Sequence, residues 1–485
     1  MGRAERVGTG HSRWREPVAP PREALLLLPQ LPATATVLGR ATRWSAPLNE
    51  LGVGVEHPGT AGPAPDLVVA TRVGDALPSG AALVLIDGLD RRGRLRRAGY
   101  QVQTYLVARA AAGAVTLAPL GSSLPQATRL STAGPRQRLR LRLRLRAILV
   151  AAVRRATGRR YVTVAHRGRL TPAAVAAALG ERRAAVLVGG GGGARRRSTF
   201  VVSGAEGPAA VVKVAPSRDR ERGRREQQVL GRLANLGGGG RTAPRPLGEG
   251  LLGTLCWSAE SALPGRPLPE VLNDLDAVRG QGLLEELAEW STALAVSTRT
   301  DGTEWEASGS TLPLRGEHER FSTWRRELTG VPGVLVHGDV GTGGNVLVDG
   351  RTFGVIDWET ARDCELPLTD LLPLLGLGLA SGRSAAERPR YLARLCAGEE
   401  PESRWLLALV RSYCSRVGVP LERAGRLAGL AWGYQASMRL VHEELVAAAG
   451  GVPDRWTSPA EELARTWWGH PSLGLAWPAL TDLGV

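Results

Sequence analysis

One stretch, residues 334–361, constrains the fold of this chain more than any other. It reads VLVHGDVGTGGNVLVDGRTFGVIDWETA, so two aspartates and an asparagine stand at the ends of short apolar segments, each beside a glycine or a tight turn. Short apolar runs bounded by such residues are typical of buried strands joined by turns. The turn VDGRT can bring Asn345 and Asp357 close together, and Asp339 directly precedes a glycine-rich loop. The stretch therefore predicts a strand hairpin that brings oxygen-bearing side chains close to one another.

The chain contains only one lysine, Lys213, among its 62 lysines and arginines. It stands within the apolar segment AAVVKVAP, where an ammonium group is costly to bury without an anionic partner. Because arginine is the default cation here, a retained lysine indicates a site that needs a compact ammonium group rather than a guanidinium fork. Glu226 on the following polar helix is the candidate partner. Glu221 is the alternative, because the sequence does not fix helix register to within a few residues.

Composition narrows the class of protein. With 485 residues and 43% hydrophobic residues, the chain is long enough for two or three globular domains. The net charge of +16 favours either a solvated arginine-rich surface or contact with polyanions. No helix–turn–helix, zinc-finger or RNA-binding signature accompanies that charge, which disfavours nucleic acid as a partner. The four cysteines lack metal-like spacing, and the N-terminus lacks a signal-peptide pattern, so we expect reduced thiols in a cytoplasmic protein.

The order of apolar, polar and basic segments along the chain predicts a division into five parts. They are a flexible arm (1–20), an α/β domain (21–135), a basic linker or helical connector (136–180), a lobe of antiparallel strands with one helix (181–262) and a helical lobe that carries the stretch 334–361 (263–485).

The first two hundred residues carry weaker signals. The segments PDLVVA, GAALVLIDG and LRRAGYQVQTYLVA are faintly similar to the later half of a methyltransferase-like doubly wound sheet, but no early glycine-rich turn precedes them. A structural, degenerate Rossmann-like domain is the favoured interpretation. The alternating segment RLRLRLRLR is either part of a connector or a contact for an anionic surface. The arginines of that possible contact are Arg138, Arg140, Arg142, Arg144 and Arg146.

The residues singled out so far are those that phosphoryl transfer requires. Such a site needs a cation on the nucleotide phosphates, hard oxygen ligands for Mg²⁺ and a carboxylate near the acceptor hydroxyl. Lys213, held by Glu226, can supply the cation. Asn345 and Asp357 can supply the metal ligands, and Asp339 can approach the hydroxyl.

The segment HGDVGTGGNVLVDGRTFGVIDWE resembles the catalytic segment of the aminoglycoside phosphotransferase/choline kinase-like family, which is related to protein kinases. The later ELPLTDLLPLL, with Pro367 and Asp370, is similar to another element of that family, and the resemblance covers roughly residues 180–480. It implies that Asp339 is the catalytic carboxylate and that Asn345 and Asp357 bind Mg²⁺. It also implies that Lys213 and Glu226 form the ion pair on the phosphates of ATP.

The resemblance implies further contacts to the nucleotide. Glu260 and Ala262, within AESAL, would belong to the hinge that binds adenine through its backbone, which leaves ATP and GTP undistinguished. Ser198 and Thr199 follow the glycine run 189–193 and are candidates to reach phosphate. One departure is that five residues, 340–344, separate Asp339 from the asparagine where the family usually has four. Glycines among them can absorb an extra residue without steric cost.

Other polar residues of the stretch have two interpretations each. His337 lies inside a tight turn, so we expect it to pack and to form hydrogen bonds rather than to act as an acid or base. Glu359, Asp363 and Glu365 either solvate a loop or line an acidic pocket for a cationic acceptor.

Together these patterns predict an α+β, bilobal protein-kinase-like phosphotransferase fold preceded by a smaller α/β domain. The expected activity is Mg²⁺- and ATP-dependent transfer of the γ-phosphate to a hydroxyl of a small molecule, such as an aminoglycoside, a sugar or an amino alcohol. Two alternatives stay open: a pseudokinase that binds nucleotide as a scaffold, and an assembly factor that associates with anionic surfaces through the arginine-rich segment.

Overall fold

The computed structural model of the chain describes part of its 485 residues. The described residues are 22–28, 32–38, 44–51, 53–56, 66–70, 83–87, 95, 101–109, 115–119, 160–166, 172–179, 185–189, 197–203, 208–236, 242–301, 323, 326–340, 344–384, 387–448, 477 and 480. The predicted flexible arm 1–20 and the arginines of segment 138–146 lie outside them.

The chain divides into two compact units. The first comprises Met1–Tyr105 and Arg160–Leu170, and the second comprises Leu106–Arg159 and Thr171–Val485. This division differs from the expected one, because residues 160–166 of the predicted connector pair with a strand of the N-terminal domain. Such a pairing joins segments far apart in sequence, so periodicity within each segment cannot reveal it.

The smaller unit contains a mainly parallel sheet. Strands β1 to β4 run parallel in the order β2-β1-β3-β4, and β7 adds to β4 in the antiparallel direction. Every residue of β3 is buried, which agrees with the near-continuous apolar runs of parallel strands. The elements of this part are η1 (Arg22–Leu27), β1 (Thr34–Val37), α1 (Ser45–Glu50), β2 (Gly54–Glu56), β3 (Leu67–Ala70), β4 (Leu83–Asp87), β5 (Gln101–Arg109, which crosses the division) and β7 (Arg160–His166).

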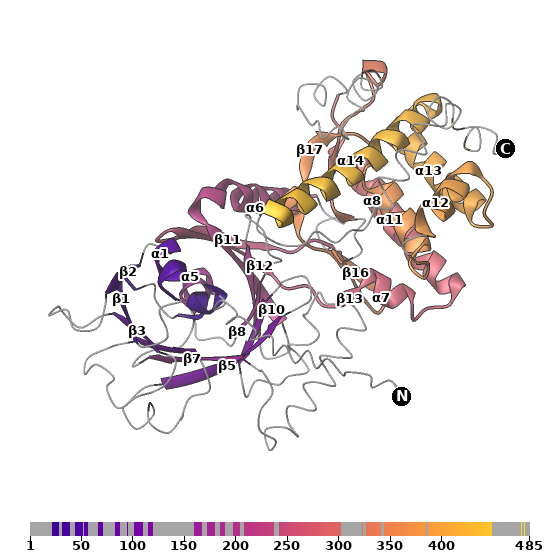
Figure 1. Ribbon diagram of the computed structural model, residues 1–485. Helices are drawn as coiled ribbons and strands as arrows, with labels where there is room; N and C mark the ends of the chain where they lie inside the picture. The colour runs from indigo at the N-terminus through magenta and orange to yellow at the C-terminus, as the bar shows by residue number, and fades with distance from the viewer. Residues whose placement is uncertain are drawn as a thin grey trace, which may run out of the picture. The chain divides into compact units, whose positions relative to one another are not determined.

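The larger unit begins with antiparallel strands and one long helix. The strands pair in the order β6-β8-β9-β10-β12-β11, and helix α6 follows β10 and packs against β11 and β12 (Figure 1). Their bounds are β6 (Val115–Pro119), α5 (Ala173–Leu179), β8 (Ala185–Gly189), β9 (Ser198–Ser203), β10 (Pro208–Pro216), η3 (Ser217–Asp219), α6 (Arg220–Asn235), β11 (Pro246–Leu252) and β12 (Leu255–Ser261). We call this part of the larger unit the strand lobe.

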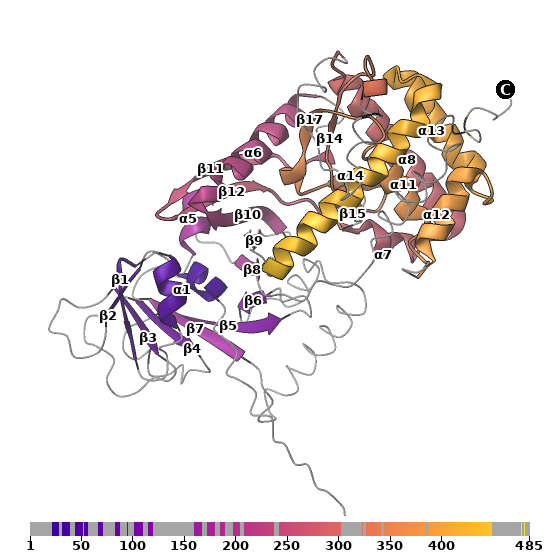
Figure 2. The same ribbon diagram turned by 45° about the horizontal axis from the view of Figure 1, so that its top comes forward.

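The rest of the larger unit is mostly helical, with short strand pairs that carry the glycine-rich segment. Helices α8, α11, α13 and α14 pack against one another (Figure 2). Their core includes the fully buried side chains of Trp358, Tyr391 and Trp432. We call this part the helical lobe. Its elements are β13 (Arg266–Pro267), α7 (Leu268–Leu272), α8 (Ala277–Thr298), β14 (Val334–Val336), β15 (Val346–Asp349), β16 (Thr352–Val355), η6 (Trp358–Thr360), β17 (Arg362–Glu365), α11 (Leu371–Leu379), α12 (Arg388–Ala397), α13 (Ser403–Val417) and α14 (Leu421–Ala448).

These two lobes confirm the expected bilobal, kinase-like α+β fold, and the smaller unit agrees with a preceding α/β domain. The predicted hairpin exists as β15 and β16, with Val346 paired to Val355 and Asp349 paired to Thr352. In the described part of the chain, none of the helices has the length and apolarity needed to cross a membrane. All four cysteines are free thiols, as predicted.

Candidate active site

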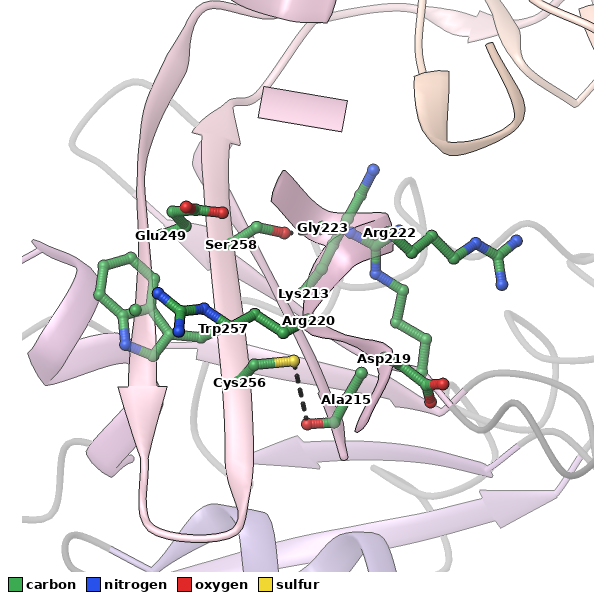
Figure 3. A pocket seen from close by; sticks show the side chains of 12 residues that line it. Lys213, Ala215, Asp219, Arg220, Arg222, Gly223, Glu249, Cys256, Trp257 and Ser258 are labelled. Carbon is green, nitrogen blue, oxygen red and sulfur yellow. Dashed lines mark hydrogen bonds between the residues drawn. The ribbon is translucent and has the colours of Figure 1, made fainter. Parts of the chain in front are cut away.

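Lys213 projects from the middle of β10 into a cluster of carboxylates. In the sheet it lies opposite Thr199 of β9 and Ser258 of β12, and only 7% of its surface is exposed. Its Nζ forms an ion pair with Glu226 and lies 3.2 Å from an oxygen of Glu260. Figure 3 shows Lys213 passing between the strands and the first turn of α6. The buried ammonium group is therefore compensated, as the sequence predicts.

The structure settles which glutamate of α6 faces Lys213. Glu226 is fully buried on the face of the helix that meets the sheet, whereas Glu221 is exposed in the first turn. Burial alone would raise the pKa of Glu226, but Lys213 and Arg197 outweigh burial and lower that pKa. Glu226 is therefore an anion fixed between two cations.

Arg197 is a residue of this cluster that the sequence did not single out. It directly precedes β9, and its guanidinium donates to Glu226 at 2.5 Å and to Ser258 Oγ at 3.0 Å. A second nitrogen of the same guanidinium is ion-paired with Glu359. In a chain with so many arginines, the run RRR before β9 carries no local signal that its last member is buried in a site.

Asp357 follows β16 and reaches toward the strand lobe. Its backbone has φ 68° and ψ 55°, the left-handed region that is uncommon for residues other than glycine, and the next residue begins η6. One of its carboxylate oxygens lies 3.2 Å from Lys213 Nζ. Burial would raise the pKa of Asp357, but Lys213 and Arg197 lower it to about 2. Unusual backbone at a charged residue is typical of sites where a side chain must be aimed.

The loop that carries Asp339 is held by buried hydrogen bonds. The Asp370 carboxylate accepts from the backbone N–H of His337 at 2.5 Å and of Gly338 at 2.9 Å. The His337 ring is buried, its Nε2 lies 2.9 Å from the Ile356 carbonyl oxygen, and its Nδ1 accepts from the Asp339 N–H at 3.2 Å. The structure agrees with a packing and hydrogen-bonding role for this histidine.

Gly338 must be a glycine for two reasons. Its φ is +83°, and a Cβ at this position would come within 2.8 Å of Tyr434 Oη and 3.1 Å of the Thr360 carbonyl oxygen. The tight approach of α14 and η6 to the loop therefore depends on the missing side chain. Asp339 is presented directly after this crowded point.

Asn345 connects the loop to the hairpin. Its Nδ2 donates to the Asp339 carbonyl oxygen at 2.9 Å and to Asp339 Oδ2 at 3.1 Å, and its own carbonyl oxygen accepts from the Ile356 N–H at 2.9 Å. Because the amide nitrogen is engaged, the side-chain oxygen is the atom left to act as a ligand. One amide oxygen and one carboxylate are a donor set that fits Mg²⁺, which commonly binds one or two carboxylates and retains several waters. Residues 341–343 of the glycine-rich spacer lie outside the described residues.

The residues predicted to contact the nucleotide, beyond Lys213 and Glu226, lie in β9, in β12 and directly after β12. Ser198 and Thr199 both lie in β9, where they pair with Val214 and Lys213 of β10. The Ala262 N–H donates to the Ala209 carbonyl oxygen at 3.1 Å, so that backbone donor already has an acceptor within the sheet. The Glu260 side chain points at Lys213, and burial, partly offset by Lys213, raises its pKa to about 7. Contacts of these residues with a nucleotide stay predictions.

The three carboxylates considered as a possible acceptor pocket all have partners within the structure. Glu359 is paired with both Arg197 and Arg222, and Asp363 is paired with Arg232. Glu365 is buried, and its carboxylate accepts from the Leu366 N–H at 3.1 Å. These partners lie more than a hundred residues away for Glu359 and Asp363, so the local sequence could not reveal that the carboxylates are already neutralised.

Comparisons with known proteins locate the relationship in the larger unit. Residues 186–407 match the family model described as the phosphotransferase enzyme family. Among solved structures, the aminoglycoside phosphotransferase APH(3'')-Id from Streptomyces rimosus ATCC10970, in complex with ADP and streptomycin, is 15% identical; the match covers 50% of this chain and 90% of that one, with a TM-score of 0.33.

Two further solved structures match with similar identity, coverage and TM-score. The ternary complex of APH(2")-IIa with streptomycin and ATP is 15% identical over 48% of this chain and 91% of that chain, with a TM-score of 0.29. An aminoglycoside-3'-phosphotransferase of type VIII is 20% identical over 46% of this chain and 86% of that chain, with a TM-score of 0.28. No curated protein matches the sequence. The family match reaches into both lobes and includes every residue of the cluster, so the similarity to the phosphotransferase enzyme family lies in residues 186–407.

Proposed function

We propose that the larger unit transfers the γ-phosphoryl group of ATP to a hydroxyl group of a small molecule. One observation carries the proposal: Lys213 from the strand lobe is ion-paired with Glu226 and lies 3.2 Å from Asp357 of the helical lobe. The hairpin that bears Asp357 also bears Asn345, which is hydrogen-bonded to Asp339. A cation, two metal ligands and a carboxylate are thus linked within one network, which is the set that phosphoryl transfer requires.

Each residue has a role that follows from its surroundings. Glu226 holds the Lys213 ammonium group, which would attract the nucleotide phosphates. Asn345 and Asp357 would hold Mg²⁺, which supplies charge neutralisation at the phosphates when bound. The low pKa of Asp357 keeps this ligand ionised throughout the neutral range. Asp339 would accept a hydrogen bond from the acceptor hydroxyl and orient it, and the Asp370 contacts keep the Asp339 loop in place.

The acceptor is proposed at the level of a hydroxyl-bearing small molecule. The carboxylates that could have selected a cationic compound are engaged by arginines, so no group in the described residues favours an aminoglycoside over a sugar or an amino alcohol. ATP is the proposed donor because residues 337–359 resemble the catalytic segment of ATP-dependent phosphotransferases, and the matched family supports it.

A nucleotide-binding scaffold without transfer is the second candidate. The observation that favours it is the five-residue spacer between Asp339 and Asn345, one residue longer than is usual in the resembling family. Metal sites tolerate little displacement of their ligands. The two candidates agree on nucleotide binding and differ only in whether phosphate leaves the nucleotide.

The test is phosphate transfer from γ-labelled ATP to a panel that contains streptomycin, glucose, choline and glycerol, with wild type and Asp339→Asn. We expect Mg²⁺-dependent transfer to at least one hydroxyl compound, reduced about 100- to 10,000-fold in Asp339→Asn, the usual range for a positioned acid or base. The control is Asp349→Asn, which replaces an exposed aspartate of the β15–β16 hairpin and should keep the wild-type rate. Nucleotide binding without transfer to any compound or to water would support the scaffold instead.

A further inference from the structure

Arg197 contacts charged side chains of both the strand lobe and the helical lobe. Its side chain is only 16% exposed, and its guanidinium contacts Glu226 on α6 and Glu359 in η6 at the same time. Ser258 Oγ accepts a third hydrogen bond at 3.0 Å. A guanidinium is a rigid planar fork that can bind two carboxylates at once, which an ammonium group on a flexible stem does less well. Arg197 thereby links α6 to η6, as the Arg222–Glu359 ion pair also does.

The two carboxylates that Arg197 joins are each next to a functional group. Glu226 is the partner of Lys213, and Glu359 comes two residues after the proposed metal ligand Asp357. Arg197 therefore places a positive charge between the partner of Lys213 and the segment that follows Asp357.

We propose that Arg197 is a positioning residue that couples the phosphate-binding cation to the metal-ligand segment, through Glu226 on one side and Glu359 on the other. The inference rests on the proposed function and adds a residue that the catalytic motifs do not contain. Its consequence is that binding of nucleotide and binding of Mg²⁺ support each other more strongly in the presence of Arg197, because one guanidinium holds both sites in register.

The chain provides a matched control. Arg232 lies on the same helix α6 and forms an ion pair with Asp363 of β17, so it too connects α6 to the segment that follows η6. That pair is more exposed, at 42% and 55% for the two side chains, and within the described part of the chain Arg232 forms no ion pair with Glu226 or Glu359. A general loss of attachment between the lobes would appear in both arginine variants, whereas loss of the proposed coupling would appear only at Arg197.

The experiment is isothermal titration of ATP into the full-length protein, with and without Mg²⁺, for wild type, Arg197→Gln, Arg197→Lys and Arg232→Gln. The quantity compared is the Kd of ATP without Mg²⁺ divided by the Kd of ATP with Mg²⁺. This ratio measures the coupling between metal and nucleotide. We expect Arg197→Gln to reduce that ratio by about 10- to 100-fold, the usual cost of removing a side chain that orients a metal ligand. Arg232→Gln should keep the wild-type ratio.

The lysine variant separates charge from geometry. Arg197→Lys restores the positive charge but not the fork, so ATP should bind without metal as it does to wild type, while the Mg²⁺ effect stays reduced. Should Arg197→Gln fail to fold, Glu359→Gln removes the Arg197–Glu359 pair together with the Arg222–Glu359 pair and should also reduce the ratio. Arg222→Gln removes the second pair alone and should keep the wild-type ratio.

The outcomes distinguish this inference from the proposed function. No ATP binding by the wild type would contradict the proposed function itself. ATP binding with equal ratios in wild type, Arg197→Gln and Glu359→Gln would overturn the inference alone. Equal reductions in Arg197→Gln and Arg232→Gln would also overturn it, because the effect would then reflect attachment between the lobes rather than this guanidinium.

Discussion

Glu260 allows a quantitative prediction about stability. Its side chain lies in β12, is 5% exposed and sits 3.2 Å from Lys213 Nζ. Burial raises the pKa of this carboxyl from an ordinary 4.5 to about 7, although Lys213 partly counteracts burial. Between these two pH values the unfolded chain has released the proton while the folded chain keeps it. The free energy of unfolding should therefore fall as pH rises through this window.

The size of the effect follows from the shift. One pKa unit corresponds to about 1.4 kcal/mol, so a shift from 4.5 to about 7 removes about 3 kcal/mol of stability between pH 4.5 and pH 7. Glu260→Gln replaces the carboxyl with a group that does not titrate. The variant should lose this component of the pH dependence, and titrating groups that do not interact with Glu260 cancel in the comparison with wild type.

Urea unfolding followed by tryptophan fluorescence at half-unit steps from pH 4 to pH 9 measures the difference. We expect the free energy of unfolding of Glu260→Gln relative to wild type to rise by about 3 kcal/mol across the window and to be constant above about pH 8. A constant difference from pH 4 to pH 9 would refute the reasoning, since Glu260 would then titrate alike in the folded and unfolded chains.

Two further substitutions test the catalytic loop. Asp370→Asn should destabilise the protein by about 1–3 kcal/mol and lower transfer activity, because an amide presents only one acceptor atom to the two N–H groups of His337 and Gly338. A free energy of unfolding and a transfer rate equal to those of wild type would contradict this prediction. Tyr434 Oη is buried against Gly338 with no hydrogen-bond partner in the described part of the chain, so Tyr434→Phe should leave stability unchanged or raise it by about 1 kcal/mol. Tyr413→Phe is its matched control: Tyr413 Oη accepts from the Leu368 N–H at 3.5 Å, so this variant should be the less stable of the two.

The sequence was sufficient for the parts of the site that depend on local chemistry. A lone lysine in an apolar strand, followed by a helix with glutamates, predicted that Lys213 has an anionic partner, with Glu226 as the candidate and Glu221 as the alternative; the structure shows Glu226. The hairpin between Asn345 and Asp357 followed from its turn residues. In both cases the signal lay within one strand and the element that follows it.

Features that depend on distant partners could not be predicted. Arg197 is one arginine among many, and only the folded chain shows that it meets both Glu226 and Glu359. The same holds for Glu359 and Asp363, which were considered for an acceptor pocket, because the α6 arginines that pair with them are more than a hundred residues away in the sequence. The inclusion of β7 in the N-terminal sheet likewise depends on pairing with β4.

The position of the Glu260 side chain is an intermediate case. Lys213 of β10 lies opposite Ser258 of β12, and Glu260 is two residues after Ser258 in β12. Because side chains alternate along a strand, Ser258 and Glu260 lie on the same face of the sheet as Lys213. That inference requires the register between β10 and β12, which the sequence alone does not provide.

The central claim is that Asp357 and Lys213 form a metal-dependent ATP site, and thermal unfolding with ATP tests it most directly. Wild type, Asp357→Ala and the hairpin control Asp349→Ala are each heated with and without Mg²⁺ at one ATP concentration, about 100 times the Kd of wild type with Mg²⁺, where binding should stabilise folded wild type by about 2.7 kcal/mol. We expect a Mg²⁺-dependent rise in Tm for wild type and Asp349→Ala that is lost in Asp357→Ala. No rise in wild type, or the same rise in Asp357→Ala, would contradict it.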